Sequence, residues 1–278
     1  MKLIADSGST KTTWCIINGN SDIEKCVTAG INPFLQSEED IALTIKNEFS
    51  LNKCPFEEIY FYGAGCANPE KSDKVRRPLH SFFGEAGIFV ESDLMAAARS
   101  LCGRNPGIAA ILGTGSNSCY YNGIEIKKHV SPLGYILGDE GSGTVLGRKL
   151  ISDILKNQLP ADICTKFFDK YKLTSAEILD KVYRQPFPNR FMAQFTHFIA
   201  ENITHPSITN LVKQSFTEFF TRNIRQFPEA ATLPVNVTGS IGWHFKDILN
   251  EAASDNGFIT GKITQDPMEG LLVYHKNQ

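Results

Sequence analysis

The sequence predicts an α/β protein built from two related domains. Strand and helix signals alternate through about the first hundred of the 278 residues, which is typical of helices layered on a sheet. A strand, a short turn rich in Gly and Ser, and a second strand occur twice, near residue 6 and near residue 113. Because this unit appears once in each half of the chain, we expect two domains that face a common cleft.

The first turn covers residues 6–12, with the sequence Asp-Ser-Gly-Ser-Thr-Lys-Thr. It lies between the apolar runs Leu3–Ala5 and Trp14–Ile17, which predicts a β-hairpin. Small residues in such a turn let backbone N–H groups approach an anion closely, and an acid at the strand end can hold a metal ion that arrives with the anion. The pattern suggests a nucleoside triphosphate site that is not a P-loop, although hairpins that bind no ligand use the same residues.

The second turn covers residues 113–118, with the sequence Gly-Thr-Gly-Ser-Asn-Ser. It follows the apolar run Ile108–Leu112, which is typical of a buried strand, and Cys119–Tyr121 continues as the returning strand. We expect Asn122-Gly123 to form the two-residue type I′ turn that ends this strand.

Apolar spacing and start signals predict the other elements. Strands are expected at 59–62, 88–91 and 235–237, and helices at 38–49, 72–83, 94 onward, 142–155, 178–183, 191–203, 208–227, 241–254 and 267–275. Thr174 and Glu177 have the spacing of a capping box, and Gly143 and Gly147 offer a face for close packing on a neighbouring backbone. We expect the many Phe residues between 191 and 227 to lie in the core.

Composition narrows the class of protein. The sequence has 28 Lys and Arg against 30 Asp and Glu, so it lacks the basic excess expected of a nucleic-acid-binding protein. Its apolar runs have the length of strands, so we expect no membrane partner, and Asp6 interrupts any signal-peptide core. The 7 cysteines are scattered without a CxxC, which favours reduced thiols and a cytoplasmic location. The 6 histidines appear remote from the motifs, so we assign them no catalytic role.

Three segments, in order along the chain, resemble the sugar kinase–actin–heat-shock ATPase superfamily. Asp6–Thr12 and Gly113–Ser116 resemble its two phosphate motifs, and Val237–Gly242 resembles its adenosine motif. The strings Leu112–Ser118 and Gly134–Ser142, together with the Glu91–Ala97 segment, resemble the N-acetylglucosamine kinase group, which belongs with the BadF/BadG/BcrA/BcrD ATPase family.

The resemblance implies two ribonuclease-H-like, or actin-like ATPase, domains flanking a nucleotide cleft. The first would cover residues 1–106, with a C-terminal helix at 266–278 that packs back onto it, and the second 107–265, with a helical insertion at 160–230. It implies ATP and Mg²⁺ as cofactors and phosphoryl transfer to a hydroxyl, usually the 6-hydroxyl, of an amino sugar. N-acetylglucosamine, glucosamine and N-acetylmuramic acid remain open as acceptors, and the chain could form a homodimer.

The resemblance also implies residue roles. ATP would be bound by the two phosphate turns and the adenosine motif, through Gly8, Ser9, Thr10, Lys11, Thr12, Gly113, Thr114, Gly115, Ser116, Gly239 and Ser240, with Gly239 and Gly242 beside the adenine. Asp6 would hold Mg²⁺ through water. The sugar would be contacted by Asn32, Asp93, Thr114, Gly134 and Asp139, with Asp93 as the general base that accepts the hydroxyl proton.

Structural roles remain open for several of these residues. Asp93 could be the N-cap of the helix that follows it, and Asp139 could cap the helix that starts at Ser142, with Glu140 as a solvated neighbour. Lys11 could be an exposed hairpin lysine, and Asn32 a turn residue.

Two other functions use the same motifs. A BadF-type ATPase that activates a redox partner needs clustered cysteines near the second phosphate turn, and Cys119 has no cysteine close in sequence. A non-enzymatic sugar sensor would not require the acids at positions 6, 93 and 139. The zinc-binding Cys-x-Cys-Gly-x-x-Gly-Cys string of the repressor, open-reading-frame and kinase (ROK) family is absent from the sequence.

Overall fold

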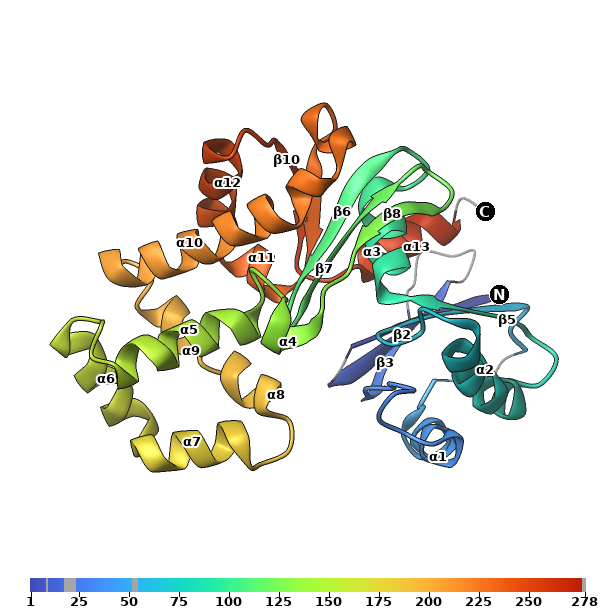
Figure 1. The fold of residues 1–278 in the computed structure, drawn as a ribbon. Coiled ribbons are helices and arrows are strands. Elements are labelled where there is room, and N and C mark those ends of the chain that lie inside the picture. The colour runs from blue at the N-terminus through green and yellow to red at the C-terminus, as the bar shows by residue number, and fades with distance from the viewer. Residues whose placement is uncertain (9, 18–23, 52–54, 277–278) are drawn as a thin grey trace. The chain divides into compact units, whose positions relative to one another are not determined.

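The computed structural model describes residues 1–8, 10–17, 24–51 and 55–276, which form two compact units (Figure 1). The first unit contains Met1–Arg104 and the chain from Pro267 onward, and the second contains Asn105–Asp266.

The first unit is a five-stranded sheet of order β3-β2-β1-β4-β5 with helices on both faces. Its strands are β1 (Lys2–Ser7), β2 (Lys11–Ile17), β3 (Glu24–Ala29), β4 (Glu58–Gly63) and β5 (Gly87–Ser92), and its helices are α1 (Glu38–Glu48), α2 (Pro69–Phe83), α3 (Asp93–Cys102) and α13 (Met268–Lys276). The first three strands are antiparallel, whereas β4 and β5 run parallel to β1.

Alternation along β1 divides the core of this unit. Leu3 and Ala5 pack with residues of α1 and α2, whereas Ile4 packs with α3 and α13, because successive strand side chains point to opposite faces. On the second face, the hydroxyl of Tyr62 lies 2.8 Å from Nε2 of His275 and accepts a 2.8 Å hydrogen bond from Arg99. These buried polar contacts join the C-terminal helix to the sheet.

The second unit contains a sheet of order β10-β9-β6-β7-β8. Its strands are β6 (Gly107–Leu112), β7 (Ser116–Tyr121), β8 (Ile126–Val130), β9 (Val235–Thr238) and β10 (Thr260–Thr264). From its antiparallel edge this order is β8-β7-β6-β9-β10, which repeats the connectivity of the first sheet. The predicted α/β class with two actin-like ATPase domains is therefore confirmed.

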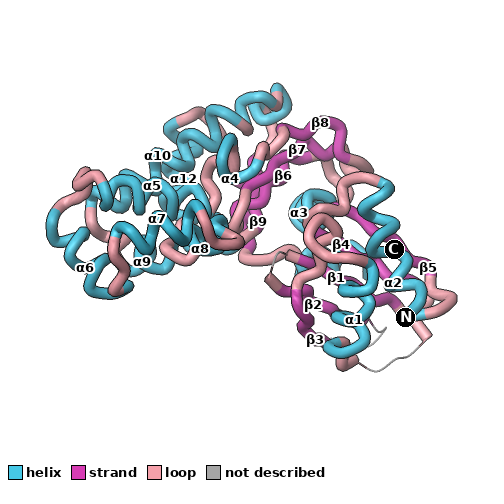
Figure 2. The backbone as a smooth tube through the Cα atoms, turned by 60° about the horizontal axis from the view of Figure 1, so that its bottom comes forward, coloured by secondary structure: helices cyan, strands magenta, loops and turns pink. Residues whose placement is uncertain are grey.

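Helices make up most of the second unit and gather beside its sheet (Figure 2). They are α4 (Gly134–Leu137), α5 (Gly143–Leu155), α6 (Ala161–Tyr171), α7 (Ser175–Tyr183), α8 (Pro188–Ala193), α9 (Thr196–Glu201), α10 (Pro206–Arg222), α11 (Ser240–His244) and α12 (Lys246–Asp255), with 3₁₀ turns at Ile224–Gln226 and Pro228–Ala231. Most of the phenylalanines between 191 and 227 are core residues, as predicted: Phe195, Phe198, Phe216, Phe219, Phe220 and Phe227 are buried, and Phe191 is partly buried against them.

Local signals are confirmed at several helix ends. Thr174 and Glu177 form the predicted capping box of α7, and the predicted glycine face of α5 allows a close approach to α8. A Cβ added at Gly147 would lie 1.9 Å from the carbonyl oxygen of Met192, so this position requires glycine for steric reasons.

Some predicted helix boundaries are wrong. The helix expected over 191–203 is broken into α8 and α9, because the Thr196 hydroxyl donates to the Ala193 carbonyl (2.7 Å) and the His197 N–H bonds Gln194 instead. The helix expected over 208–227 ends at Arg222.

The turn after β7 also differs from the expected two-residue type I′ turn. Tyr121 pairs with Ile126, which leaves a loop of residues 122–125. The side-chain oxygen of Asn122 accepts hydrogen bonds from the N–H groups of Ile124 (2.9 Å) and Glu125 (2.8 Å), and this Asx-type arrangement stabilises the longer loop.

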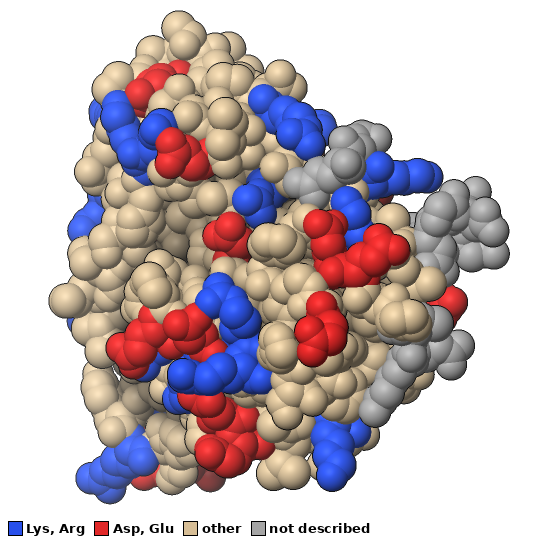
Figure 3. Space-filling model, turned by 90° about the vertical axis from the view of Figure 1, so that its right-hand side faces the viewer, with Lys and Arg blue, Asp and Glu red and all other residues tan. Residues whose placement is uncertain are grey.

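Charges of both signs are interspersed on the face drawn in Figure 3. Within the part of the chain that the structure describes, the helices are too short or too polar to cross a bilayer.

Candidate functional site

The β1–β2 hairpin presents a short, exposed tip. The Gly8 N–H donates to the Lys11 carbonyl (3.0 Å), and Gly8, Thr10 and Lys11 are exposed. Asp6 is partly buried near the end of β1, where it pairs with Thr13 of β2. Ser9, the other predicted phosphate ligand of this turn, lies outside the described residues.

Thr12, which the sequence predicted as a phosphate ligand, belongs to the stem of this hairpin. Its side chain is fully buried, and its hydroxyl lies 2.7 Å from the Ser7 hydroxyl and donates to the Ala29 carbonyl. The Ser7 hydroxyl also bonds the backbone of Ile31, at 2.9 and 3.0 Å. Because these hydroxyls are used inside the fold, Thr12 stabilises the hairpin and does not present its hydroxyl to a ligand.

Asn32 follows this network and organises a turn. Its side-chain oxygen accepts from the Phe34 N–H (2.9 Å), and its own N–H donates to the Gln36 side chain (2.7 Å). Asn32 therefore has the turn role that the sequence left open. Its side-chain amide nitrogen is the group through which it would contact a ligand.

Asp93 is the first residue of α3 and follows β5 directly. Ser92 is the N-cap, because its side chain accepts from the Met95 N–H (3.2 Å), so capping does not account for Asp93. Burial raises the pKa of the Asp93 carboxyl above the ordinary value, and hydrogen bonds from the N–H groups of Leu94 and of Asp93 itself oppose this shift. A desolvated carboxylate at a strand–helix junction is typical of a catalytic base.

The β6–β7 turn is bonded to the start of α5. The Gly113 carbonyl accepts from the Gly143 N–H (2.8 Å), and the Thr114 carbonyl accepts from the N–H (3.1 Å) and hydroxyl (2.7 Å) of Thr144. The first N–H groups of a helix have no partner within the helix. The turn satisfies two of them here and is thereby held in a defined position.

Asp139 lies against the other side of the same turn. Its carboxylate accepts from the Ser116 N–H (3.2 Å), and a Cβ added at Gly115 would lie 3.2 Å from Oδ2. Burial raises the pKa of Asp139, the Ser116 bond lowers it, and the charge of Glu140 raises it further. Ser142, not Asp139, caps α5. The predicted phosphate turn and sugar-binding acid are therefore in contact, and the Ser116 N–H is already occupied by Asp139.

Glu140 is buried, and the expectation of a solvated neighbour is wrong. It is 8% exposed, and its two carboxylate oxygens contact Arg222 (2.8 Å) and Asn223 (3.1 Å) at the end of α10. Gly134 is exposed at the start of α4, with a φ of 73°.

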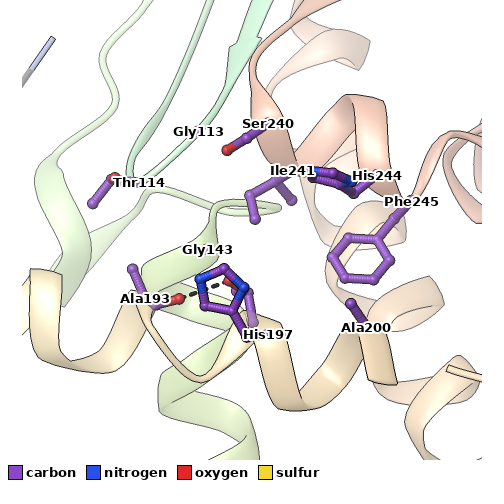
Figure 4. Close-up of a pocket in the computed structure, with 11 residues that line it drawn as sticks. Gly113, Thr114, Gly143, Ala193, His197, Ala200, Ser240, Ile241, His244 and Phe245 are labelled. Atoms are coloured by element: carbon purple, nitrogen blue, oxygen red, sulfur yellow. Dashed lines mark hydrogen bonds between the residues drawn. The ribbon is translucent and has the colours of Figure 1, made fainter. Parts of the chain in front are cut away.

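A pocket of about 260 Å³ in the second unit joins two of the predicted nucleotide motifs (Figure 4). The β6–β7 turn and the start of α5 contribute Gly113, Thr114 and Gly143, and α11 with the residue after it contributes Ser240, Ile241, His244 and Phe245. Helices α8 and α9 supply the remaining lining residues, Ala193, Thr196, His197 and Ala200.

Gly239 and Gly242 pack beneath this pocket and do not line it. A Cβ at Gly239, where φ is 121°, would lie 2.4 Å from the Leu112 carbonyl oxygen, and one at Gly242 would lie 2.6 Å from Val237. These glycines let α11 approach β6 and β9, and their predicted contact with adenine stays a prediction.

Sequence reasoning missed both histidines of the pocket. His244 is four residues after Ser240 on one helix, and this spacing could have placed the two on the same side. His197 is brought in by the break between α8 and α9, for which the sequence offered no signal.

No group of three or more His, Cys, Asp or Glu side chains is placed to hold a metal among the residues that the structure describes. A single carboxylate such as that of Asp6 suits Mg²⁺, which keeps most of its water ligands and also binds substrate phosphates.

The chain was compared with known proteins. No family model matches it, and no curated protein matches it. A Porphyromonas gingivalis protein, provisionally assigned as an N-acetylglucosamine kinase, is 45% identical with a TM-score of 0.96, covering 100% of this chain and 99% of that one. A second provisionally assigned N-acetylglucosamine kinase, from Chromobacterium violaceum, is 18% identical with a TM-score of 0.75, covering 98% of each chain.

A ROK family glucokinase from Streptomyces griseus, solved with glucose and AMPPNP, has a TM-score of 0.58 at 13% identity, covering 99% of this chain and 98% of that one. This likeness, like the 18% match, concerns the fold alone. The match at 45% identity covers nearly the whole of both chains. The chain therefore belongs to the N-acetylglucosamine kinase-like family, a group of phosphotransferases in the sugar kinase–actin–heat-shock ATPase superfamily.

Proposed function

We propose that the protein transfers the γ-phosphoryl group of ATP to the 6-hydroxyl of N-acetylglucosamine. The observation that carries this proposal is the pocket of the second unit, where Gly113 and Thr114 of a predicted phosphate turn meet Ser240 of the predicted adenosine motif. Ligand pockets bring a few polar groups to an otherwise apolar cavity, as this one does. Family membership, and the name given to the Porphyromonas gingivalis neighbour, support the choice of acceptor.

The pocket divides into parts suited to different portions of a nucleotide. Gly113 and Thr114 would face the phosphates, whereas His197, His244 and Phe245 supply aromatic surface for the base (Figure 4). Ala193 and Ala200 line the same pocket, and their small side chains would leave room for the base.

In the first unit, the exposed tip of the β1–β2 hairpin would contact the β- and γ-phosphates. Thr10 would offer a backbone N–H group and Lys11 a positive charge, whereas the Gly8 N–H already donates to the Lys11 carbonyl, so Gly8 would only allow the phosphate a close approach. Asp6 would hold Mg²⁺ through water, and the ion would neutralise charge on the phosphate oxygens.

Asp93 and Asp139 would have different roles in binding and activating the sugar. Asp93 would accept the proton of the attacking hydroxyl, and Asp139 would accept hydrogen bonds from other hydroxyls next to the phosphate turn. Asn32, Thr114 and Gly134 would complete the contacts. The cysteines are scattered in the sequence without a CxxC, which would fit a cytoplasmic location.

ADP release should depend on the amino sugar. We expect N-acetylglucosamine to give the highest kcat/KM among N-acetylglucosamine, glucosamine and N-acetylmuramic acid, with a 6-phosphate product identified by phosphorus NMR. The 6-deoxy analogue, which lacks the acceptor hydroxyl, should give no product. Equal ADP release with and without sugar would contradict the proposal and favour an ATPase.

Filling the pocket should weaken ATP binding selectively. In Ala200→Phe, a ring would occupy the space assigned to the base, so the KM for ATP should rise about tenfold, on the order of 1.4 kcal/mol, with little change in the KM for the sugar. Ala161→Phe, at an exposed position at the start of α6, is the matched control. An unchanged KM for ATP in Ala200→Phe would place the nucleotide elsewhere.

Asp93→Asn should remove turnover while ATP still binds. An amide cannot accept the hydroxyl proton, so kcat should fall by about 10²–10⁴, whereas the Kd for ATP should change less than about threefold by calorimetry. Glu91→Gln, two residues earlier on β5, neutralises a carboxylate outside the site and should retain activity. Near-normal turnover of Asp93→Asn would exclude Asp93 as the base.

The same variant should be more stable than the native protein at neutral pH. Because burial raises the Asp93 pKa in the folded state, ionising this group costs stability as pH rises from the unfolded value of 3.8 through the folded value. Asn removes that cost, so the gain in unfolding free energy should be present at pH 8 and shrink on acidification toward pH 4. A variant less stable than the native protein at pH 8 would show that the carboxylate is not destabilised by burial.

A further inference from the structure

The loop that carries Asp139 is tied to the end of α10 through the neighbouring acid, Glu140. One oxygen of the buried Glu140 carboxylate contacts Nε of Arg222 at 2.8 Å, and the other accepts from the side-chain amide of Asn223 at 3.1 Å. Arg222 is the last residue of α10, and Asn223 is its C-cap. Burying an unpaired carboxylate costs free energy. The contacts with Arg222 and Asn223 therefore stabilise Glu140 in its buried position under the loop.

The backbone of this loop needs such support. Asp139 has a φ of 55°, in the left-handed region that residues with a Cβ rarely adopt, and Gly141 has a φ of 77°. The Asp139 carbonyl accepts from the Ser142 N–H (3.1 Å), which closes the turn. A Cβ added at Gly141 would lie 3.0 Å from Cβ of Phe219, so the turn also rests directly on α10.

Packing against the core does not explain why Arg222 contacts Glu140, because the Arg222 side chain is mostly exposed. Its side chain is 62% exposed, whereas that of Glu140 is 11% exposed. The positive charge lies at the C-terminal end of a helix, where the helix dipole favours it, and a carboxylate alone would be disfavoured at the same place. The positive charge of Arg222 therefore offsets the unfavourable interaction of the Glu140 carboxylate with the helix dipole. It also offsets the Glu140 charge, which acts on the adjacent Asp139 carboxyl.

We propose that Glu140, tethered by Arg222 and Asn223, is a positioning residue that fixes the turn at Asp139 and so directs the Asp139 carboxylate toward the acceptor sugar. The proposal rests on the role given to Asp139 in the proposed function. It assigns to α10, a helix remote in sequence from the phosphate turns, a part in recognising the sugar and none in binding the nucleotide.

Steady-state kinetics of Arg222→Met and Glu140→Gln test this assignment. Both variants should raise the KM for N-acetylglucosamine about tenfold and change the KM for ATP less than about twofold, and Arg222→Lys should recover part of the loss. Because the Arg222 side chain is mostly exposed, its variants should fold as the native protein does. Glu218→Gln, one turn earlier on α10, removes an ion pair with Lys149 (2.6 Å) without touching the loop and should behave as the native protein.

Hydrogen exchange of the ligand-free proteins gives a readout that does not require activity. Arg222→Met should speed exchange at the Ser142 and Ser116 amides, which bond Asp139, about tenfold relative to the native protein and to Glu218→Gln. Unchanged exchange, or faster exchange with an unchanged KM for the sugar, would overturn the proposal. If the native protein phosphorylates no amino sugar, the proposed function fails and the role in sugar recognition fails with it, whereas the exchange result still decides whether Arg222 holds the turn.

Discussion

The arrangement of the β6–β7 turn in the second unit depends on the hydrogen bond from the Ser116 N–H to the Asp139 carboxylate. This contact joins the β6–β7 turn to the loop before α5, while the bonds from Gly143 and Thr144 hold the same turn from the helix side. The turn is thus fixed on two sides before any ligand arrives. Groups that are fixed in advance need not be ordered when the ligand binds, which is how a binding site gains affinity and catalytic precision.

In each unit, candidate site residues have backbone conformations or charges that cost stability. Asp139 has a left-handed backbone, Gly239 allows a close approach to Leu112, and Asp93 is desolvated at the start of α3. Large buried side chains of the second unit, such as Phe198, offset part of this cost. The same core supports the break between α8 and α9, which turns His197 and Ala200 toward the pocket.

The sequence predicted the features that depend on neighbouring residues. The repeated strand–turn–strand unit led to the two sheets of equal connectivity, and local spacing located the capping box at Thr174 and the close approach at Gly147. The sequence did not predict the features that depend on the tertiary fold. The Glu140 anchor joins residues 83 positions apart, His197 reaches the pocket through a helix break, and Thr12 is buried because Ser7 and Ala29 bond its hydroxyl. No local pattern reveals such pairs.

The proposed function requires that the carboxylates of Asp6, Asp93 and Asp139 serve one bound ATP and one sugar. A crystal structure of the protein with a non-hydrolysable ATP analogue, Mg²⁺ and N-acetylglucosamine tests it most directly. The account predicts the base beside His197, Asp6 bound to the ion through water, and the Asp93 carboxylate within about 3.2 Å of the 6-hydroxyl, with Asp139 on other hydroxyls. A nucleoside outside this pocket, or a sugar that contacts neither Asp93 nor Asp139, would contradict the account.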